Sequence, residues 1–182
     1  MVHIYADAAT PKEKGTAYDV AVWGKGAVAF LVGAEGGIFY SEKHAAELVR
    51  RAKREKALSS PLLELENYVR GVMLSVEEWE PDEVVVFGDC KPAEEQIAGC
   101  FPEEEDARAL LWGLWEAQIE RNFRMRMCRL GRTHPKIVLA DGLSRNDPSA
   151  IQEAKAGGYV QRSTKPVGWW PNGQTSCSRR KD

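Results

Sequence analysis

Four acidic side chains stand at the predicted ends of strands and helices and could form one site: Asp7, Glu64, Asp89 and Asp141. Carboxylates brought close together repel one another, and proteins commonly relieve that repulsion by binding divalent cations. Oxygen ligands of this kind favour Mg²⁺, with Mn²⁺ as a substitute. Two such ions roughly 4 Å apart activate a water molecule and stabilise the leaving oxygen in phosphodiester cleavage. No serine–histidine–aspartate arrangement, Walker glycine loop or zinc-ligand spacing in the sequence competes with this set.

Two further acids are alternatives to members of this set. Glu66 stands two residues after Glu64 on the same predicted helix, where it would point about 200° away around the helix axis. Asp147 follows Asp141 closely and could replace it. The spacing alone leaves both choices open.

The elements that must position these acids indicate a mixed α/β fold. Residues 2–8 form a β-prone run that ends near Asp7, and β-rich runs at 17–23, 27–32 and 38–40 follow it between glycines, as in antiparallel hairpins. A helical period from Leu62 to about Trp79 precedes a strand of consecutive valines that ends at Asp89. A strand–helix–strand crossover of this kind makes the later strand parallel to an earlier one, and ligands gather outside the carboxyl ends of such strands.

Basic residues lie in two further segments. The segment 43–56 is predicted to be helical and is either a solvent-exposed surface helix or an arm that contacts phosphates. The segment 121–129 alternates apolar and basic residues, as in a half-buried strand, and continues into a basic rim that contains no acid. We expect these basic residues to hold a polyanionic substrate: Arg51, Arg54, Arg124, Arg126, Arg129, Arg132 and Lys136.

Composition is that of a globular protein. The 182 residues are 43% hydrophobic and 29% charged, and the net charge of −2 predicts no general affinity for nucleic acid or membranes. The four cysteines have no metal-binding spacing, there is no signal-peptide pattern, and no apolar run approaches the roughly 20 residues that span a bilayer. We therefore expect a cytoplasmic protein with a catalytic domain over residues 1–155 and a basic tail over 156–182 that contains Gly, Ser and Trp.

The chain resembles the ribonuclease H family, most closely the ribonuclease H domains of LTR-retrotransposon and other retroelement reverse transcriptases. The resemblance covers roughly residues 1–150 and depends on the joint order of five stretches. The last of them is the most specific, because it is similar to the Ala-Asp-x-Leu-Ser-Arg block that ends retrotransposon ribonuclease H domains. The stretches are Tyr5–Ala8, Gly24–Val28, Leu63–Leu65, Val86–Asp89 and Val138–Arg145.

The resemblance implies a ribonuclease H-like fold with a mixed sheet of about five strands, the first three antiparallel and the later ones parallel to the first, flanked by helices. It implies that Asp7, Glu64, Asp89 and Asp141 hold two Mg²⁺ ions and that the RNA strand of an RNA–DNA hybrid is hydrolysed. His134 occupies a place comparable to a catalytic histidine of the family and would carry protons or assist product release. A reverse transcriptase or a replication protein is the implied protein partner.

Two other functions are compatible with the same residues. One is a DNA nuclease or junction resolvase of the same fold, and the other is a non-catalytic nucleic-acid-binding module. The presence of all four acids argues against the second. The chain also departs from the family's pattern, since the loop after Asp7 is longer than usual and could contain an inserted strand at 17–23. The sequence alone does not distinguish a free-standing enzyme from a piece of a polyprotein.

Overall fold

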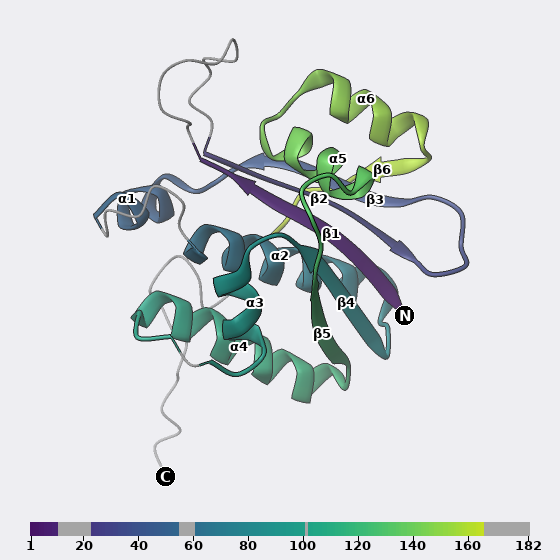
Figure 1. Ribbon diagram of the computed structural model, residues 1–182. Helices are drawn as coiled ribbons and strands as arrows, with labels where there is room; N and C mark the ends of the chain where they lie inside the picture. The colour runs from purple at the N-terminus through teal and green to yellow at the C-terminus, as the bar shows by residue number, and fades with distance from the viewer. Residues whose placement is uncertain (11–22, 55–60, 101, 166–182) are drawn as a thin grey trace.

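A computed structural model describes residues 1–10, 23–54, 61–100 and 102–165, apart from the side chains of residues 51–54. The strand expected at 17–23 lies, except for Trp23, outside these residues. The described chain forms one sheet of six strands in the order β5-β4-β1-β2-β3-β6, with helices on both faces (Figure 1).

The sheet is mixed, as the sequence predicts. Strands β1, β2 and β3 are antiparallel neighbours; β4 is parallel to β1, and β5 is parallel to β4. The sixth strand, β6, lies in the segment assigned to the tail and pairs in parallel with β3. The strands are Val2–Ala9 (β1), Gly24–Leu31 (β2), Gly37–Lys43 (β3), Glu83–Gly88 (β4), Arg124–Arg129 (β5) and Tyr159–Gln161 (β6).

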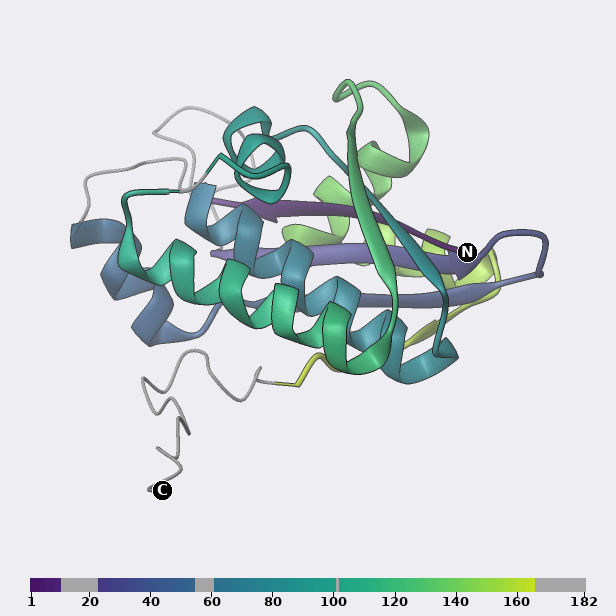
Figure 2. The same cartoon turned by 90° about the horizontal axis from the view of Figure 1, so that it is seen from below.

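The helices form two groups, one on each face of the sheet. Figure 1 shows α5 and α6 above the sheet and the other helices below it, and Figure 2 shows α2 and α4 crossing the lower face side by side. The helices are Ala46–Arg54 (α1), Pro61–Trp79 (α2), Lys91–Ile97 (α3), Glu105–Arg121 (α4), Pro135–Ser144 (α5) and Pro148–Ala156 (α6). None of these described helices is long and apolar enough to cross a membrane.

The central strand β1 is buried on both faces because its alternate side chains enter two cores. Ile4 and Ala6 join the core beneath the sheet with residues of α2 such as Leu65. Tyr5 joins the smaller core above the sheet with residues of α5 such as Leu143. A strand held from both sides has little freedom, so the position of Asp7 near its end is well fixed.

Helix α5 lies unusually close to the sheet. A Cβ atom added to Gly26 of β2 would come within 2.4 Å of the Ser144 backbone nitrogen, so only glycine permits this approach. The sequence indicated that Asp141 stands at the end of an element; it lies inside α5, in the last turn. The close packing at Gly26 therefore brings the part of α5 that contains Asp141 onto β1 and β2.

Candidate metal centre

Three carboxylates from three separate elements meet at one edge of the sheet. Asp7 lies two residues before the end of β1, Glu64 lies in the first turn of α2, and Asp89 directly follows β4. One oxygen of each lies within 4.8 Å of the others. The parallel pairing of β1 with β4 places their carboxyl ends together, and the packing of α2 against β1 brings the start of α2 to the same edge.

Backbone groups hold the acids in this arrangement. The Ala8 N–H donates to Glu64 Oε1 at 3.2 Å. Asn67, less than one turn after Glu64, donates through Nδ2 to the Asp7 carbonyl oxygen at 2.8 Å and to the Gly26 carbonyl oxygen at 3.3 Å. These bonds tie β1, β2 and α2 together beside Asp7 and Glu64.

Asp141 approaches Asp7 from α5, on the other side of Asp7 from Glu64. Burial, a hydrogen bond with Asp141 and the charges of Asp141 and Asp89 raise the pKa of Asp7 to about 8. Ser144 Oγ lies between the two acids, 2.6 Å from the Asp141 carbonyl oxygen and 3.4 Å from Asp7 Oδ2. Arg145 Nε donates to Asp141 Oδ1 at 3.1 Å. Asp7 therefore adjoins both Asp141 and the group that it forms with Glu64 and Asp89.

The electrostatics of the group favour a bound cation. Burial first, and then the charge of Asp7, raise the pKa of Glu64 well above its ordinary value. Glu64 Oε2 is buried without a hydrogen-bond partner in the described part of the chain. An all-oxygen donor set with an unpartnered buried oxygen suits a hard divalent cation such as Mg²⁺ or Mn²⁺. The residues present therefore fit the metal that the resemblance implies.

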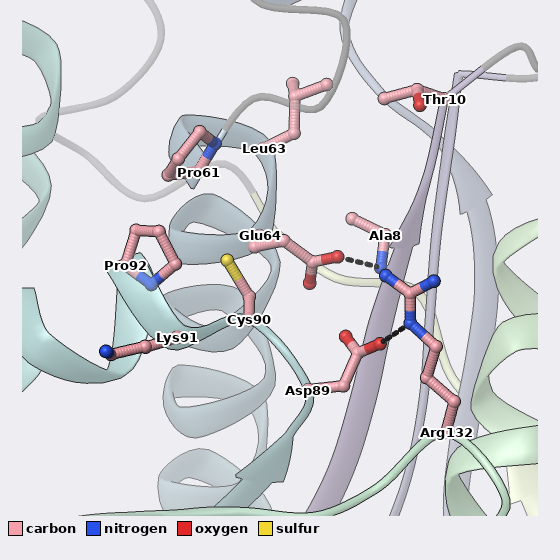
Figure 3. A pocket seen from close by; sticks show the side chains of 10 residues that line it. All are labelled: Ala8, Thr10, Pro61, Leu63, Glu64, Asp89, Cys90, Lys91, Pro92 and Arg132. Atoms are coloured by element: carbon pink, nitrogen blue, oxygen red, sulfur yellow. Dashed lines mark hydrogen bonds and ion pairs between the residues drawn. The ribbon is translucent and has the colours of Figure 1, made fainter.

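A cavity of about 270 Å³ opens beside the carboxylates, between the first turns of α2 and α3. Figure 3 shows Glu64 and Asp89 pointing into it, with Arg132 reaching in from the loop before α5. Arg132 Nε donates to Asp89 Oδ2 at 2.7 Å, although the arginine side chain is 88% exposed. A solvent-exposed guanidinium thus contacts one of the carboxylates that would bind a metal ion.

Glu66, the alternative to Glu64, lies in a different environment. It is fully buried with Lys25 Nζ at 3.2 Å, His44 Nδ1 at 3.4 Å and the Arg70 guanidinium in contact. Burial acts to raise the pKa of Glu66, but a hydrogen bond from His44 and the charges of Lys25 and Arg70 outweigh it and lower the pKa to about 2. Glu66 is an anion enclosed by cations, away from the three acids that converge.

Asp147, the alternative to Asp141, caps helix α6. Its Oδ1 accepts the backbone N–H of Ser149 at 2.9 Å, the usual arrangement for an aspartate at the N-cap of a helix. This contact accounts for Asp147 as a structural residue.

His134 caps α5 in a similar way. Its Nδ1 accepts the Lys136 backbone N–H at 3.3 Å, and its ring stacks on Tyr5 with centroids 5.5 Å apart. Tyr5 and Asp7 point to the same face of β1, and side chains two residues apart on a strand are separated by about 6.5 Å. His134 thus lies over Tyr5, whose side chain is the neighbour of Asp7 on the same face of β1.

The fold of the chain, but not its sequence, is similar to that of known proteins. No family model matches the sequence, and no curated protein matches it. Among solved structures, the N-terminal ribonuclease H domain of a Mycobacterium tuberculosis protein has a TM-score of 0.53 at 20% identity, covering 84% of this chain and 97% of that one. Ribonuclease H1 of Halobacterium salinarum has a TM-score of 0.52 at 18% identity, covering 81% of this chain and 97% of that one. The chain has the ribonuclease H fold.

A third neighbour has this fold with its ligand bound. The ribonuclease H1 called LC11, isolated from compost, is in complex with an RNA/DNA hybrid; it has a TM-score of 0.52 at 15% identity and covers 84% of this chain and 99% of that one. These comparisons confirm the predicted fold class. The retroelement likeness and a reverse transcriptase or replication protein as partner stay predictions.

The basic rim expected from the sequence is neutralised in part by acids from other elements of the ribonuclease H fold. Arg126 pairs with Glu83 at 3.1 Å and Arg129 pairs with Glu94 at 3.8 Å, besides the Arg132–Asp89 pair. Lys136 Nζ lies over the Phe30 ring, 5.0 Å from its centroid. The side chains of Arg51 and Arg54 lie outside the described residues. The basic segment contains no acids of its own, because the acids that pair with its arginines are distant in the chain.

Sequence reasoning missed two residues that orient Asp7, Asn67 and Ser144. Asn67 stands among other polar residues of α2, Glu64, Glu66 and Arg70, so no sequence pattern set it apart. Ser144 stands inside the Ala-Asp-x-Leu-Ser-Arg block that the resemblance rests on, but its contact with Asp7 joins residues at opposite ends of the chain.

Proposed function

We propose that the protein is a divalent-metal-dependent endonuclease that hydrolyses the RNA strand of RNA–DNA hybrids. The observation that carries the proposal is the meeting of Asp7, Glu64 and Asp89 within 4.8 Å, with Asp141 adjoining Asp7. Such a group of carboxylates, held at the carboxyl edge of a sheet, is suited to binding divalent metal ions.

Asp7, Glu64, Asp89 and Asp141 would hold two Mg²⁺ ions, with Mn²⁺ as a substitute. When bound, the ions would supply an activated water and charge stabilisation at the leaving oxygen. Asp7 would be the central ligand residue, because it adjoins Glu64 and Asp89 as well as Asp141. Its raised pKa of about 8 means that metal binding near neutral pH must displace a proton from this carboxyl.

His134 would carry protons for the reaction. Because Nδ1 accepts the Lys136 N–H, the neutral ring holds its proton on Nε2, where it is available to a leaving group or a product. Tyr5 stacking fixes the plane of the ring. This placement supports a role beside the acids, in agreement with the resemblance.

The substrate class is proposed from two supports. A solved structure with the same fold contains an RNA/DNA hybrid. In this chain, Arg132 lies at the mouth of the cavity and Arg124 is exposed on the outer strand β5, so both could contact phosphates. Arg126 and Arg129 would contribute after exchanging Glu83 and Glu94 for phosphate. Arg51, Arg54 and Lys136 stay proposed contacts. The cytoplasm stays the predicted location.

The test is cleavage of end-labelled RNA–DNA hybrid, duplex DNA and duplex RNA with Mg²⁺, and with EDTA as a blank. We expect cleavage of the RNA strand of the hybrid alone. Cleavage of DNA only would identify a DNA nuclease or junction resolvase with the same metal centre, and metal-independent binding without cleavage would identify a binding module.

Paired variants locate the centre. Asp141→Asn should lower the cleavage rate by at least about 100-fold. Asp147→Asn, which loses only a helix cap, should keep a rate within about threefold of the parent protein. Equal activity of Asp89→Asn and the parent protein would refute the metal centre proposed here.

A further inference from the structure

A tyrosine lies directly behind the carboxylate of Glu64. Tyr68 follows Glu64 by four residues on α2, so both side chains lie on the same face of the helix. Tyr68 is 0% exposed, and among the described residues it is one of the largest side chains that are fully buried. Neither the sequence motifs nor the proposed reaction assigns it a role.

Two buried polar atoms meet here without partners. Tyr68 Oη and Glu64 Oε2 are both buried and make no hydrogen bond in the described part of the chain. Glu64 Oε1, in contrast, is held by the Ala8 N–H. The Tyr68 hydroxyl is nevertheless within interaction range of the Glu64 carboxyl group. A buried polar atom left unpaired costs free energy, so a small shift that completes this contact as a hydrogen bond is favourable.

Gly88 shows where the tyrosine hydroxyl lies. A Cβ atom on Gly88 would fall 2.2 Å from Tyr68 Oη and 2.7 Å from Cζ, so the hydroxyl rests against the backbone just before Asp89. The hydroxyl therefore lies between α2 and the end of β4, beneath both Glu64 and Asp89. The hydroxyl occupies the position where a side chain on Gly88 would begin.

The chemistry of the two groups suits a hydrogen bond in one direction. A tyrosine hydroxyl carries one hydrogen that it can donate, and a carboxylate oxygen only accepts. Tyr68 is therefore the donor and Glu64 Oε2 the acceptor in any bond between them.

We propose that Tyr68 is a positioning residue of the metal centre, whose hydroxyl donates to Glu64 Oε2 when Glu64 is a carboxylate ligand. With Ala8 N–H on Oε1 and Tyr68 on Oε2, both oxygens are held and the plane of the carboxylate cannot turn. The lone pairs that remain then face the cavity. The proposal rests on the proposed metal centre and is independent of which nucleic acid is cut.

Tyr68→Phe tests this role because it removes one oxygen and keeps the ring. Mn²⁺ affinity is measured by isothermal titration calorimetry, without substrate. We expect Tyr68→Phe to bind Mn²⁺ about 10-fold more weakly, within the 10- to 100-fold range of outer-shell partners of metal ligands. The melting temperature of the metal-free protein should not fall, since the hydroxyl has no partner there to lose.

Ser75→Ala is the matched control. Ser75 also lies on α2 with a buried hydroxyl that has no hydrogen-bond partner among the described residues, but it is about three turns beyond Glu64. Its Mn²⁺ affinity should equal that of the parent protein. Cleavage by Tyr68→Phe should recover at saturating Mn²⁺, since only the hold on one ligand is lost.

A double mutant isolates the contact itself. In a Glu64→Gln background, which already binds Mn²⁺ more weakly, Tyr68→Phe should have no further effect. Equal Mn²⁺ affinity of Tyr68→Phe and Ser75→Ala would overturn the positioning role, as would an undiminished effect of Tyr68→Phe in the Glu64→Gln background. A parent protein that binds Mn²⁺ but leaves the hybrid intact contradicts the proposed substrate and not the role of Tyr68.

Discussion

Glu64 and Glu66 lie two residues apart on α2 and face opposite environments. Glu64 meets Asp7 and Asp89, and burial together with Asp7 raises its pKa. Glu66 is enclosed by His44, Lys25 and Arg70, and its pKa falls to about 2. A glutamate thus lies among other acids at position 64 and among basic side chains at position 66, because a step of two residues turns about 200° around a helix.

Glu66→Gln should destabilise the protein by about 3–5 kcal/mol, because it leaves the buried charges of Lys25 and Arg70 without their anion. Urea unfolding at pH 7 measures this loss. Glu64→Gln is the control and should not lower the stability of the metal-free protein, since it removes a carboxylate from a group of like charges. Equal stabilities of the two variants would contradict the division of roles.

The stability supplied by Glu66 should depend on pH at the acidic end. Its folded-state pKa of about 2 is below its ordinary value of 4.5, so the contribution is complete above about pH 4.5 and is lost as the pH falls toward 2. Unfolding free energies measured between pH 2 and 6 should show this slope in the parent protein. The slope should be reduced in Glu66→Gln.

Metal binding should release a proton from Asp7. Its pKa of about 8 in the metal-free protein means that the carboxyl is mostly protonated at pH 7, and a metal ligand must be a carboxylate. Mn²⁺ affinity should therefore rise with pH up to about 8 and then level off. Calorimetry at pH 7 in two buffers with different heats of ionisation should give different apparent enthalpies; identical values would contradict the prediction.

Asp7→Asn should stabilise the metal-free protein at pH 9 while removing activity. A folded-state pKa raised from 3.8 to about 8 means that the parent protein loses stability as the pH rises through that window. The asparagine variant carries no such charge, so its melting temperature should exceed that of the parent at pH 9 and approach it near pH 4. Mg²⁺ should raise the melting temperature of the parent but not of the variant.

Arg132→Gln should bind Mn²⁺ more tightly than the parent protein by a few-fold at low salt. The Arg132 guanidinium contacts Asp89 Oδ2 at 2.7 Å and must leave it before a cation can bind there. The same variant should bind RNA–DNA hybrid more weakly, with a shallower dependence on salt, because one phosphate contact is lost. Arg126→Gln, whose partner is Glu83, serves as the control and should leave Mn²⁺ affinity unchanged.

Gly26→Ala should reduce both stability and activity. Its methyl group would meet the Ser144 nitrogen at 2.4 Å, so α5 would have to move away from the sheet and take Asp141 with it. Overpacking of this kind costs about 1–3 kcal/mol. Gly131→Ala has open space around the added carbon and should be neutral in both assays. Unchanged cleavage by Gly26→Ala would show that the position of Asp141 is not critical.

The sequence by itself predicted a mixed sheet with antiparallel first strands and a later parallel strand, and it placed Asp7 and Asp89 at the ends of strands. The run of valines before Asp89 and the apolar strand before Asp7 are buried on both faces, and burial of that kind is visible in composition. Helix α2 was predictable from its period and begins at Pro61, as a proline in the first turn favours. Such features depend on neighbours in sequence, so local physics determines them.

Only the tertiary structure separated Glu64 from Glu66 and Asp141 from Asp147. The members of each pair differ in the side chains around them. Glu66 contacts Lys25 and His44, and Asp141 contacts Asp7, and all these neighbours are distant in sequence. The sequence also did not predict helix α5 or strand β6. Helix α5 packs closely on the sheet at Gly26, and strand β6 forms by pairing with β3. Charge environments and close packing arise from contacts between distant segments, and folding brings those segments together.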